Sequence, residues 1–228
     1  MALAVCMTIA SSRNASADWL NTTGAETAPN FAEIEVLEDR VQVALEIDPA
    51  EIAAFGPGAA AVVSEDGVVP DLTQLAQSAN NLFTVRAEGD VPLEANVIEI
   101  DVRRRAAKPT AIRPAGMPPP PPGPSRSPTV VRAVLEYPFS DQPARLSFAP
   151  PLDEKGRTTV SMGFLARHRR GPITDYRYLS QPETLNLNWD DPWYSAFENP
   201  NLARHHRSAL MSFISIEPRE VRHEIILR

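Results

Sequence analysis

The sequence predicts a mainly β fold, with two small β modules joined by a proline-rich linker and the second module an immunoglobulin-like β-sandwich. Two observations favour this prediction. Short segments in which apolar and polar residues alternate recur along the chain, with turn residues between them. Between two sets of such segments lies a stretch rich in arginine and proline, and proline cannot join a β-ladder because it lacks the backbone N–H donor. The hydrophobic fraction of 43% is ordinary for a folded protein.

The first predicted module, residues 31–102, contains strands and two short helices. Apolar and polar residues alternate from Arg40 to Ile47, as on a strand with one solvated face. Asp48, which is followed by proline, and Asp71 are typical helix caps. The apolar parity changes near Val97, which predicts a β-bulge. The predicted elements are strands at 31–36, 40–47, 82–88 and 93–102 and helices at 49–55 and 71–79.

The second predicted module, residues 129–228, holds short strands that are separated by turns. Their number and spacing are typical of an immunoglobulin-like sandwich. The chain has a single cysteine, Cys6, so the cysteine pair of antibody domains is missing and the assignment rests on the strand count. The predicted strands lie at 131–137, around 146–148, and at 158–167, 173–179, 185–189, 211–217 and 221–227.

The remaining segments are predicted to lie outside the modules. Residues 103–128 form the linker, in which the run from Pro118 to Pro122 favours an extended polyproline helix that acts as a spacer. Residues 1–17 predict a secretory signal peptide, because a short apolar run precedes the small-residue pattern Ala15-Ser16-Ala17. Residues 18–30 are small and polar and are predicted to be a tether.

The predicted leader places the protein outside the cytoplasm, in a bacterial periplasm or at the cell surface. No later stretch approaches the roughly 20 apolar residues of a membrane helix, so we predict no transmembrane segment. The net charge is −7, and the first 102 residues carry 17 acidic and 3 basic side chains. Because an acidic surface repels phosphates, we expect no nucleic-acid partner.

Aromatic and acidic residues concentrate between Trp189 and Glu198, although the whole chain is only 7% aromatic. The proline after Asp191 is predicted to end the preceding strand and to begin a turn or short helical loop. The spacing of Trp193 and Phe197 would place both rings on one side of a helical turn. These rings either plug one end of the sandwich or form a platform for a sugar, a peptide or a partner surface.

The acidic residues of this segment permit two interpretations. Two carboxylates at a fixed separation could be the acid/base pair of a glycoside hydrolase, with the rings against the sugar. Asp-Asp-Pro and Glu-Asn-Pro are also typical of turns, in which side-chain oxygens accept backbone N–H donors. The basic stretch at residues 204–207 either forms salt bridges with these acids or holds an anionic ligand. The candidate binding residues are Trp189, Asp190, Asp191, Trp193, Tyr194, Phe197, Glu198, Arg204 and His205.

The histidines do not predict a metal site. His205 and His206 are adjacent, so their side chains point in different directions, and no second pair stands three or four residues away. His168, in an arginine-rich run, is predicted to be solvated, and His223 to be a hydrogen-bonded core residue. The sequence has no phosphate-binding loop, dinucleotide fingerprint or nucleophile elbow. We therefore predict no cofactor and no catalytic residues, and an enzyme function has no residue set behind it.

Strings at residues 31–41, 175–179, 188–197, 201–206 and 217–224 carry a resemblance. They resemble a family of uncharacterised exported bacterial proteins in which a β-rich extracytoplasmic region precedes further sequence. A weaker resemblance is to the exported front parts of HupE/UreJ-like membrane proteins. The resemblance is most specific in Asn188-Trp-Asp-Asp-Pro-Trp-Tyr-Ser-Ala-Phe197, and it implies no catalytic residue. It implies that the chain is a fragment of a longer protein or the product of a truncated gene, because family members continue beyond the corresponding end.

The sequence favours a non-catalytic extracytoplasmic accessory or interaction module of a bacterial envelope protein or assembly. Its partner would be an envelope or membrane protein, or a downstream part of the same protein. The alternative is a carbohydrate- or anion-binding module, hydrolytic or not, that uses the aromatic and acidic loop at residues 189–198.

Overall fold

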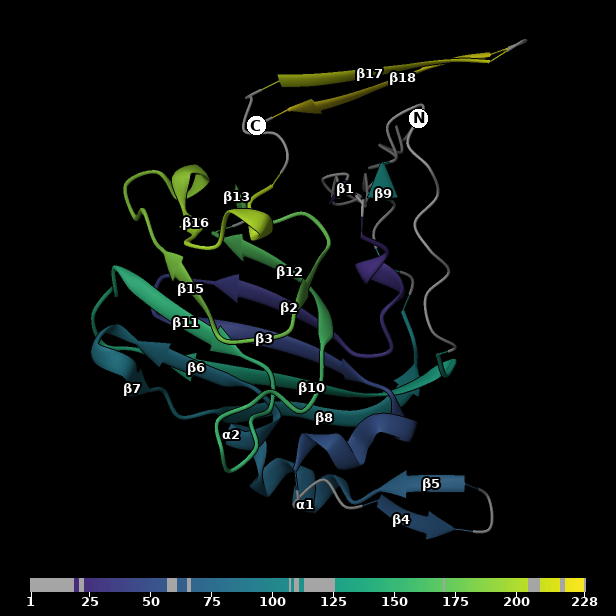
Figure 1. Ribbon diagram of the computed structural model, residues 1–228, viewed down its shortest axis with the longest axis vertical. Helices are drawn as coiled ribbons and strands as arrows, with labels where there is room; N and C mark the ends of the chain where they lie inside the picture. The colour runs from purple at the N-terminus through teal and green to yellow at the C-terminus, as the bar shows by residue number, and fades with distance from the viewer. Residues whose placement is uncertain are drawn as a thin grey trace, which may run out of the picture.

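The computed structural model describes residues 19–20, 23–56, 61–64, 67–106, 108, 111–112, 126–169, 171–204, 210–217 and 220–227. In this part of the chain the fold is mainly β, as predicted. Two sheets pack against each other through a shared core, with short ladders and helices around them (Figure 1).

The larger sheet has seven strands. They are β2 (Phe31–Val36), β3 (Arg40–Ile47), β8 (Asn96–Arg104), β10 (Thr129–Pro138), β12 (Met162–His168), β13 (Gly171–Pro172) and β14 (Arg177–Leu179). The strand order is β13-β12-β2-β3-β10-β8, and β14 also pairs with β12. Neighbouring strands run antiparallel except β2 and β12, which run parallel.

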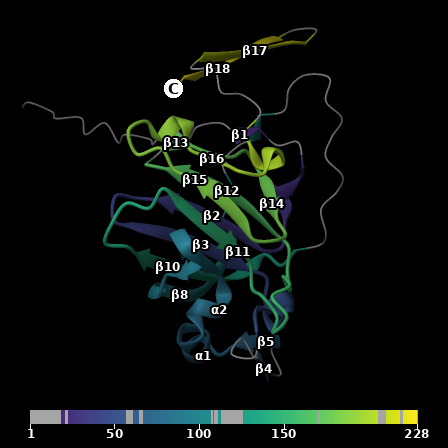
Figure 2. The same cartoon turned by 60° about the vertical axis from the view of Figure 1, so that its left-hand side comes forward.

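The smaller sheet has five strands, all antiparallel to their neighbours. They are β6 (Thr84–Ala87), β7 (Val91–Pro92), β11 (Arg145–Ala149), β15 (Glu183–Asn186) and β16 (Ala196–Phe197). Their order is β16-β15-β11-β6-β7, and Figure 2 shows this sheet from a second direction.

Three two-stranded ladders and several short helices complete the described fold. The ladders pair β1 (Trp19–Leu20) with β9 (Ala111–Ile112), β4 (Ala61–Ser64) with β5 (Gly67–Pro70), and β17 (Leu210–Glu217) with β18 (Glu220–Leu227). The α-helices are α1 (Leu72–Gln77) and α2 (Ala79–Leu82). The 3₁₀ helices are η1 (Ala25–Thr27), η2 (Pro49–Phe55), η4 (Glu88–Asp90), η5 (Pro192–Tyr194) and η6 (Pro200–Leu202).

Strand pairing corrects the expected division into two separate modules at residues 31–102 and 129–228. β10, from the second predicted module, lies between β3 and β8 of the first. β12 pairs with β2, and β11 pairs with β6, so each sheet combines strands from both halves of the chain. Alternation along a strand shows which face is apolar but not which strand lies beside it. The error therefore concerns partners and not the strands themselves.

The core joins the two halves as one hydrophobic unit. Leu135 of the larger sheet and Phe148 and Leu185 of the smaller sheet are fully buried in one cluster. Tyr137 buries its ring in this cluster, and its hydroxyl donates to the carbonyl oxygen of Phe83 at 2.7 Å. Because the buried hydroxyl has an acceptor, the ring is buried without leaving its polar atom unpaired.

Several local predictions are confirmed. β3 spans Arg40–Ile47, as the alternation indicated. Asp48 and Asp71 accept backbone N–H bonds at the starts of η2 and α1, so both act as caps. β8 skips Ile98 where it pairs with β10, which is the bulge expected near Val97.

The ends of the stretch predicted to be a linker lie together. β8 continues to Arg104, and the backbone N–H of Arg105 donates to the carbonyl oxygen of Pro128 at 2.8 Å. Residues 103–128 therefore connect two neighbouring strands of one sheet and do not separate two modules. The proline run itself lies outside the described residues.

Part of the predicted tether is packed against the larger sheet. Ala25, Ala28 and Asn30 are buried. Gly163 of β12 makes this close approach possible, because a Cβ built there would lie 2.1 Å from the carbonyl oxygen of Ala25. The signal peptide predicted at residues 1–17 lies outside the described residues. No helix in the described ranges has both the length and the apolar character that crossing a membrane requires.

Candidate functional site

The aromatic segment, residues 189–198, comes after strand β15 of the smaller sheet, and its 3₁₀ turn η5 packs beside β13 of the larger sheet. β15 ends at Asn186, three residues before the predicted end of this strand at Trp189. Pro192 opens a single 3₁₀ turn that ends at Tyr194, and the chain is extended again by the next residue. Phe197 consequently lies in β16 and not on the turn, which corrects the expectation that Trp193 and Phe197 share one helical turn.

Phe197 and Trp189 are used inside the fold. Phe197 is buried, with its ring against Phe148 and Phe164. Trp189 is half-buried, and its indole N–H donates to the carbonyl oxygen of Pro143 at 2.8 Å. These contacts fix both rings as packing elements.

His168 lies beneath Trp189. Its ring is fully buried and meets the indole edge to face, with ring centroids 4.5 Å apart. This burial corrects the expectation of a solvated histidine: β12 places the side chain on its inner face, whereas the charged residues beside it gave the sequence a polar appearance.

Ser195 is the hydrogen-bond partner of His168. The serine Oγ accepts the backbone N–H of Asn188 at 2.9 Å and lies 2.7 Å from His168 Nδ1. The hydroxyl and Nδ1 therefore share one hydrogen bond, and which of them donates depends on the ring tautomer. Nε2 is buried and has no hydrogen-bond partner among the described residues. Burial, with a smaller contribution from Arg169, lowers the pKa of His168 to about 4, so the ring is neutral at pH 7.

Arg204 holds the turn that carries Trp193. The guanidinium carbon lies 3.5 Å from the centroid of the Trp193 ring, within cation–π distance. The same group donates to the carbonyl oxygens of Trp193 and Pro172, at 2.7 and 2.5 Å. Arg204 thus cross-links the turn to β13, and the neighbouring candidate His205 lies outside the described residues.

The three acidic candidates have different surroundings. Asp191 accepts the backbone N–H of Trp193 at 3.2 Å and caps η5, as expected of a turn residue. Asp190 and Glu198 are exposed. Tyr194 is 60% exposed, so it is the aromatic residue of this loop that presents most of its ring to solvent.

Arg169 connects the segment to a surface hollow of about 340 Å³. Its guanidinium donates to the carbonyl oxygen of Trp189 at 3.2 Å and lies 5.3 Å from that ring's centroid. It also forms an ion pair with Glu38. The hollow is lined by Glu35, Leu37, Glu38, Asp39, Arg40 and Arg169. Glu38 and Asp39 of this lining already pair with Arg169 and Arg40. No group of three or more potential metal ligands occurs within the described residues.

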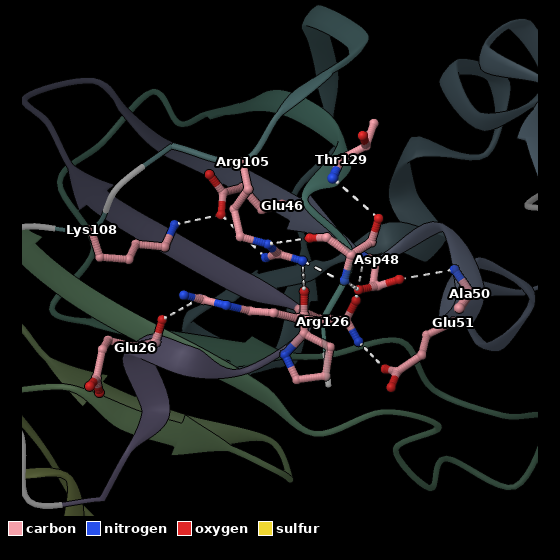
Figure 3. Close-up of polar contacts among 12 residues, drawn as sticks. Glu26, Glu46, Asp48, Ala50, Glu51, Arg105, Lys108, Arg126 and Thr129 are labelled. Atoms are coloured by element: carbon pink, nitrogen blue, oxygen red, sulfur yellow. Dashed lines mark hydrogen bonds and ion pairs between the residues drawn. The ribbon is translucent and has the colours of Figure 1, made fainter. Parts of the chain in front are cut away.

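A buried charged cluster lies where residues 103–128 leave and rejoin the sheet (Figure 3). Arg105 donates to the carbonyl oxygens of Pro29 and Ser127, at 2.9 and 3.1 Å. Its guanidinium lies 3.6 Å from Glu46 and 3.4 Å from Asp48. The side chains of all three charged residues are at most 10% exposed.

Both carboxylates of this cluster have further partners. Glu46 accepts from Lys108 Nζ at 2.7 Å, and Asp48 accepts the backbone N–H of Ser127 at 2.7 Å. Burial lowers the pKa of Arg105, and the neighbouring Glu46 and Asp48 oppose this change. The cluster therefore fixes both ends of the stretch to one point. The cluster has no signature in the sequence, because arginine and lysine beside prolines have the composition of a solvated linker.

The β17–β18 hairpin exposes an apolar face. Both views show the hairpin standing clear of the two sheets (Figures 1 and 2). Its strands pair over their full length, so residues that lie opposite each other share a face. The large apolar side chains exposed on this face are Leu210, Ile214, Ile216, Val221 and Ile225.

This face corrects two expectations. Both strands were expected to belong to the core of the second sandwich, but they pair only with each other among the described strands. His223 lies on the apolar face, as expected, and is bonded to Ser212 at 2.7 Å, but it is exposed. The alternation in β17 and β18 does mark an apolar face, but this face is exposed to solvent.

Comparison with known proteins found no matching family model, no similar curated protein and no similar solved structure.

Proposed function

We propose that the protein is a non-catalytic interaction module that acts outside the cytoplasm, as an accessory part of a bacterial envelope protein or assembly. The observation that supports this proposal most directly is the exposed apolar face of the β17–β18 hairpin. Exposed contiguous apolar patches are typical of interaction sites. A lone two-stranded hairpin is marginally stable in water, so a partner would also stabilise this element.

The contacts of the aromatic segment support a structural role for its rings, which were candidate binding residues. Trp189 and Phe197 pack inside the fold, and Trp193 lies under Arg204. A general acid of the glycosidase type needs an apolar surrounding that keeps it protonated. Asp190 and Glu198 are solvent-exposed, which does not suit that role.

The sequence supports the proposed location outside the cytoplasm and the proposed association with the bacterial envelope. The apolar run before Ala15-Ser16-Ala17 favours export, and the resemblance to exported bacterial proteins favours the envelope. An immunoglobulin-like type for the two-sheet core is part of the same proposal. The partner is an envelope or membrane protein, which includes a further copy of this chain, or another part of the assembled protein.

Binding of a carbohydrate or an anion by the 189–198 loop is a second candidate function. The 60% exposure of Tyr194, in the same loop as the exposed Asp190, is the observation that favours it. A tyrosine ring at the surface offers a stacking face to a sugar. Quenching of tryptophan fluorescence distinguishes the two functions, because glycans should change the emission only if the loop binds them.

Site-specific photo-crosslinking tests the proposed interaction surface. A photoreactive amino acid replaces Ile214 of the hairpin, which is 59% exposed, and in a control replaces Ile98 of β8, which is 56% exposed. Both chains are produced with residues 1–17 in a bacterium and irradiated in whole cells. We expect ultraviolet-dependent adducts from position 214 and not from position 98. Adducts from neither position, or equally from both, would contradict the proposal.

A further inference from the structure

The apolar face of the β17–β18 hairpin is exposed over its full length, and its exposure, charge and area indicate what binds to it. On this face Ile214 lies opposite His223, and Ile216 lies opposite Val221. Ile216 is 80% exposed, and the least exposed of the large apolar side chains, Ile225, is still 53% exposed. The described remainder of the chain therefore leaves this face uncovered.

The face carries no permanent charge at its described positions. Besides the five apolar side chains it holds Ser212 and His223, whose side chains bond to each other at 2.7 Å. In a two-fold symmetric contact the same patch meets itself, so a charged patch would repel its own copy. This face avoids that repulsion, and its central polar pair already satisfies one hydrogen bond internally, which reduces the cost of removing it from water.

The area of the face fits a dimer. From their exposed fractions, the five apolar side chains present roughly 500 Å² per copy, so two copies packed face to face would bury roughly 1,000 Å². Specific interfaces begin at about this size. A foreign partner would need an apolar patch of matching shape, whereas a second copy supplies one of equal size and length.

We infer that the apolar face of the β17–β18 hairpin packs against the same face of a second copy of this chain, giving a two-fold symmetric homodimer. The inference rests on the proposed function and names its partner. Two hairpins stacked in this way form a small two-layer β-structure in which each hairpin covers the other, which supplies the packing that a lone hairpin lacks.

Sedimentation velocity of the purified 228-residue chain tests the inference. Between about 1 and about 100 µM we expect the wild-type chain to change from mainly monomer to mainly dimer, as an interface near the lower size limit implies. Ile214→Asp would place an unpaired carboxylate in both halves of the interface and should weaken the dimer at least about 100-fold. Ile98→Asp, at a matched exposure in β8, should leave dimerisation unchanged.

Hydrogen exchange provides a second measurement that does not depend on a variant. Backbone amides of β17 and β18 should be protected at high concentration and should lose protection on dilution, while those of β3 and β10 stay protected throughout. A wild-type chain that remains monomeric at about 100 µM, or a dimer that Ile214→Asp does not weaken, would overturn the inference.

The two experiments together distinguish failure of the homodimer from failure of the proposed interaction module. If the purified chain is monomeric but position 214 forms adducts with another protein in cells, the second-copy inference fails and the interaction module stands. If position 214 forms no adducts at all, both fail. Adducts of twice the mass of the chain, together with the concentration-dependent dimer, support both.

Discussion

Acidification is expected to destabilise the fold through His168. Its buried ring has a pKa of about 4, against 6.5 for an ordinary histidine. Between these values the unfolded chain binds a proton that the folded chain does not, so the stabilisation is complete above pH 6.5 and is lost as the pH falls. Linkage gives a loss of about 2 kcal/mol at pH 5 and about 3 kcal/mol by pH 4.

Urea unfolding at pH 7, 6 and 5 measures this loss. His168→Gln is the comparison, because glutamine is neutral at each pH and its side-chain oxygen can accept the Ser195 hydroxyl. We expect the variant to lose about 2 kcal/mol less than the wild type between pH 7 and pH 5. Other titrating groups are common to both chains and cancel in the difference. Equal pH dependence of the two chains would refute the reasoning, and a ring NMR titration of the wild type gives the pKa of His168 directly.

Two substitutions test other buried contacts. Arg105→Met should lower the free energy of unfolding by about 3 kcal/mol, because two buried carboxylates lose their guanidinium partner. Arg103→Met, at an exposed ion pair in β8 two residues earlier, is the control, and equal urea midpoints for the two variants would disprove the burial argument. Trp189→Phe should cost about 1 to 2 kcal/mol, because the carbonyl oxygen of Pro143 loses its donor; an unchanged melting temperature would show that the indole does not hold the loop.

Local structure was predictable where one residue's conformation decides it. Alternation defined β3 to the residue, and the change of parity near Val97 located the bulge. Asp48 and Asp71 marked the starts of η2 and α1, because a carboxylate before a helix accepts its free backbone N–H groups. In each case the information lies within a few consecutive residues.

Long-range pairing was not predictable in the same way. Every strand with one apolar face suits any sheet that needs such a face, so the insertion of β10 between β3 and β8 has no signature in the alternation. Arg105 was missed for a related reason, since its partner Asp48 lies 57 residues earlier in the chain. For the aromatic segment, the residue types indicated packing at Trp189. The burial of His168 was missed because the strand predicted at 158–167 ends one residue before it, whereas β12 continues to His168 with that side chain on the same face as the buried Phe164 and Ala166.

The parallel pairing of β2 with β12 governs the order in which this chain can fold. Phe31 lies beside Gly163, so the outer edge of β2 has no neighbour until most of the chain has been made or delivered. During that interval the β2–β3 hairpin presents open backbone donors and acceptors to any other extended chain. Such a chain benefits from remaining unfolded until β12 is available to pair with β2. Aggregation would compete most strongly with folding when many incomplete chains are present at high concentration.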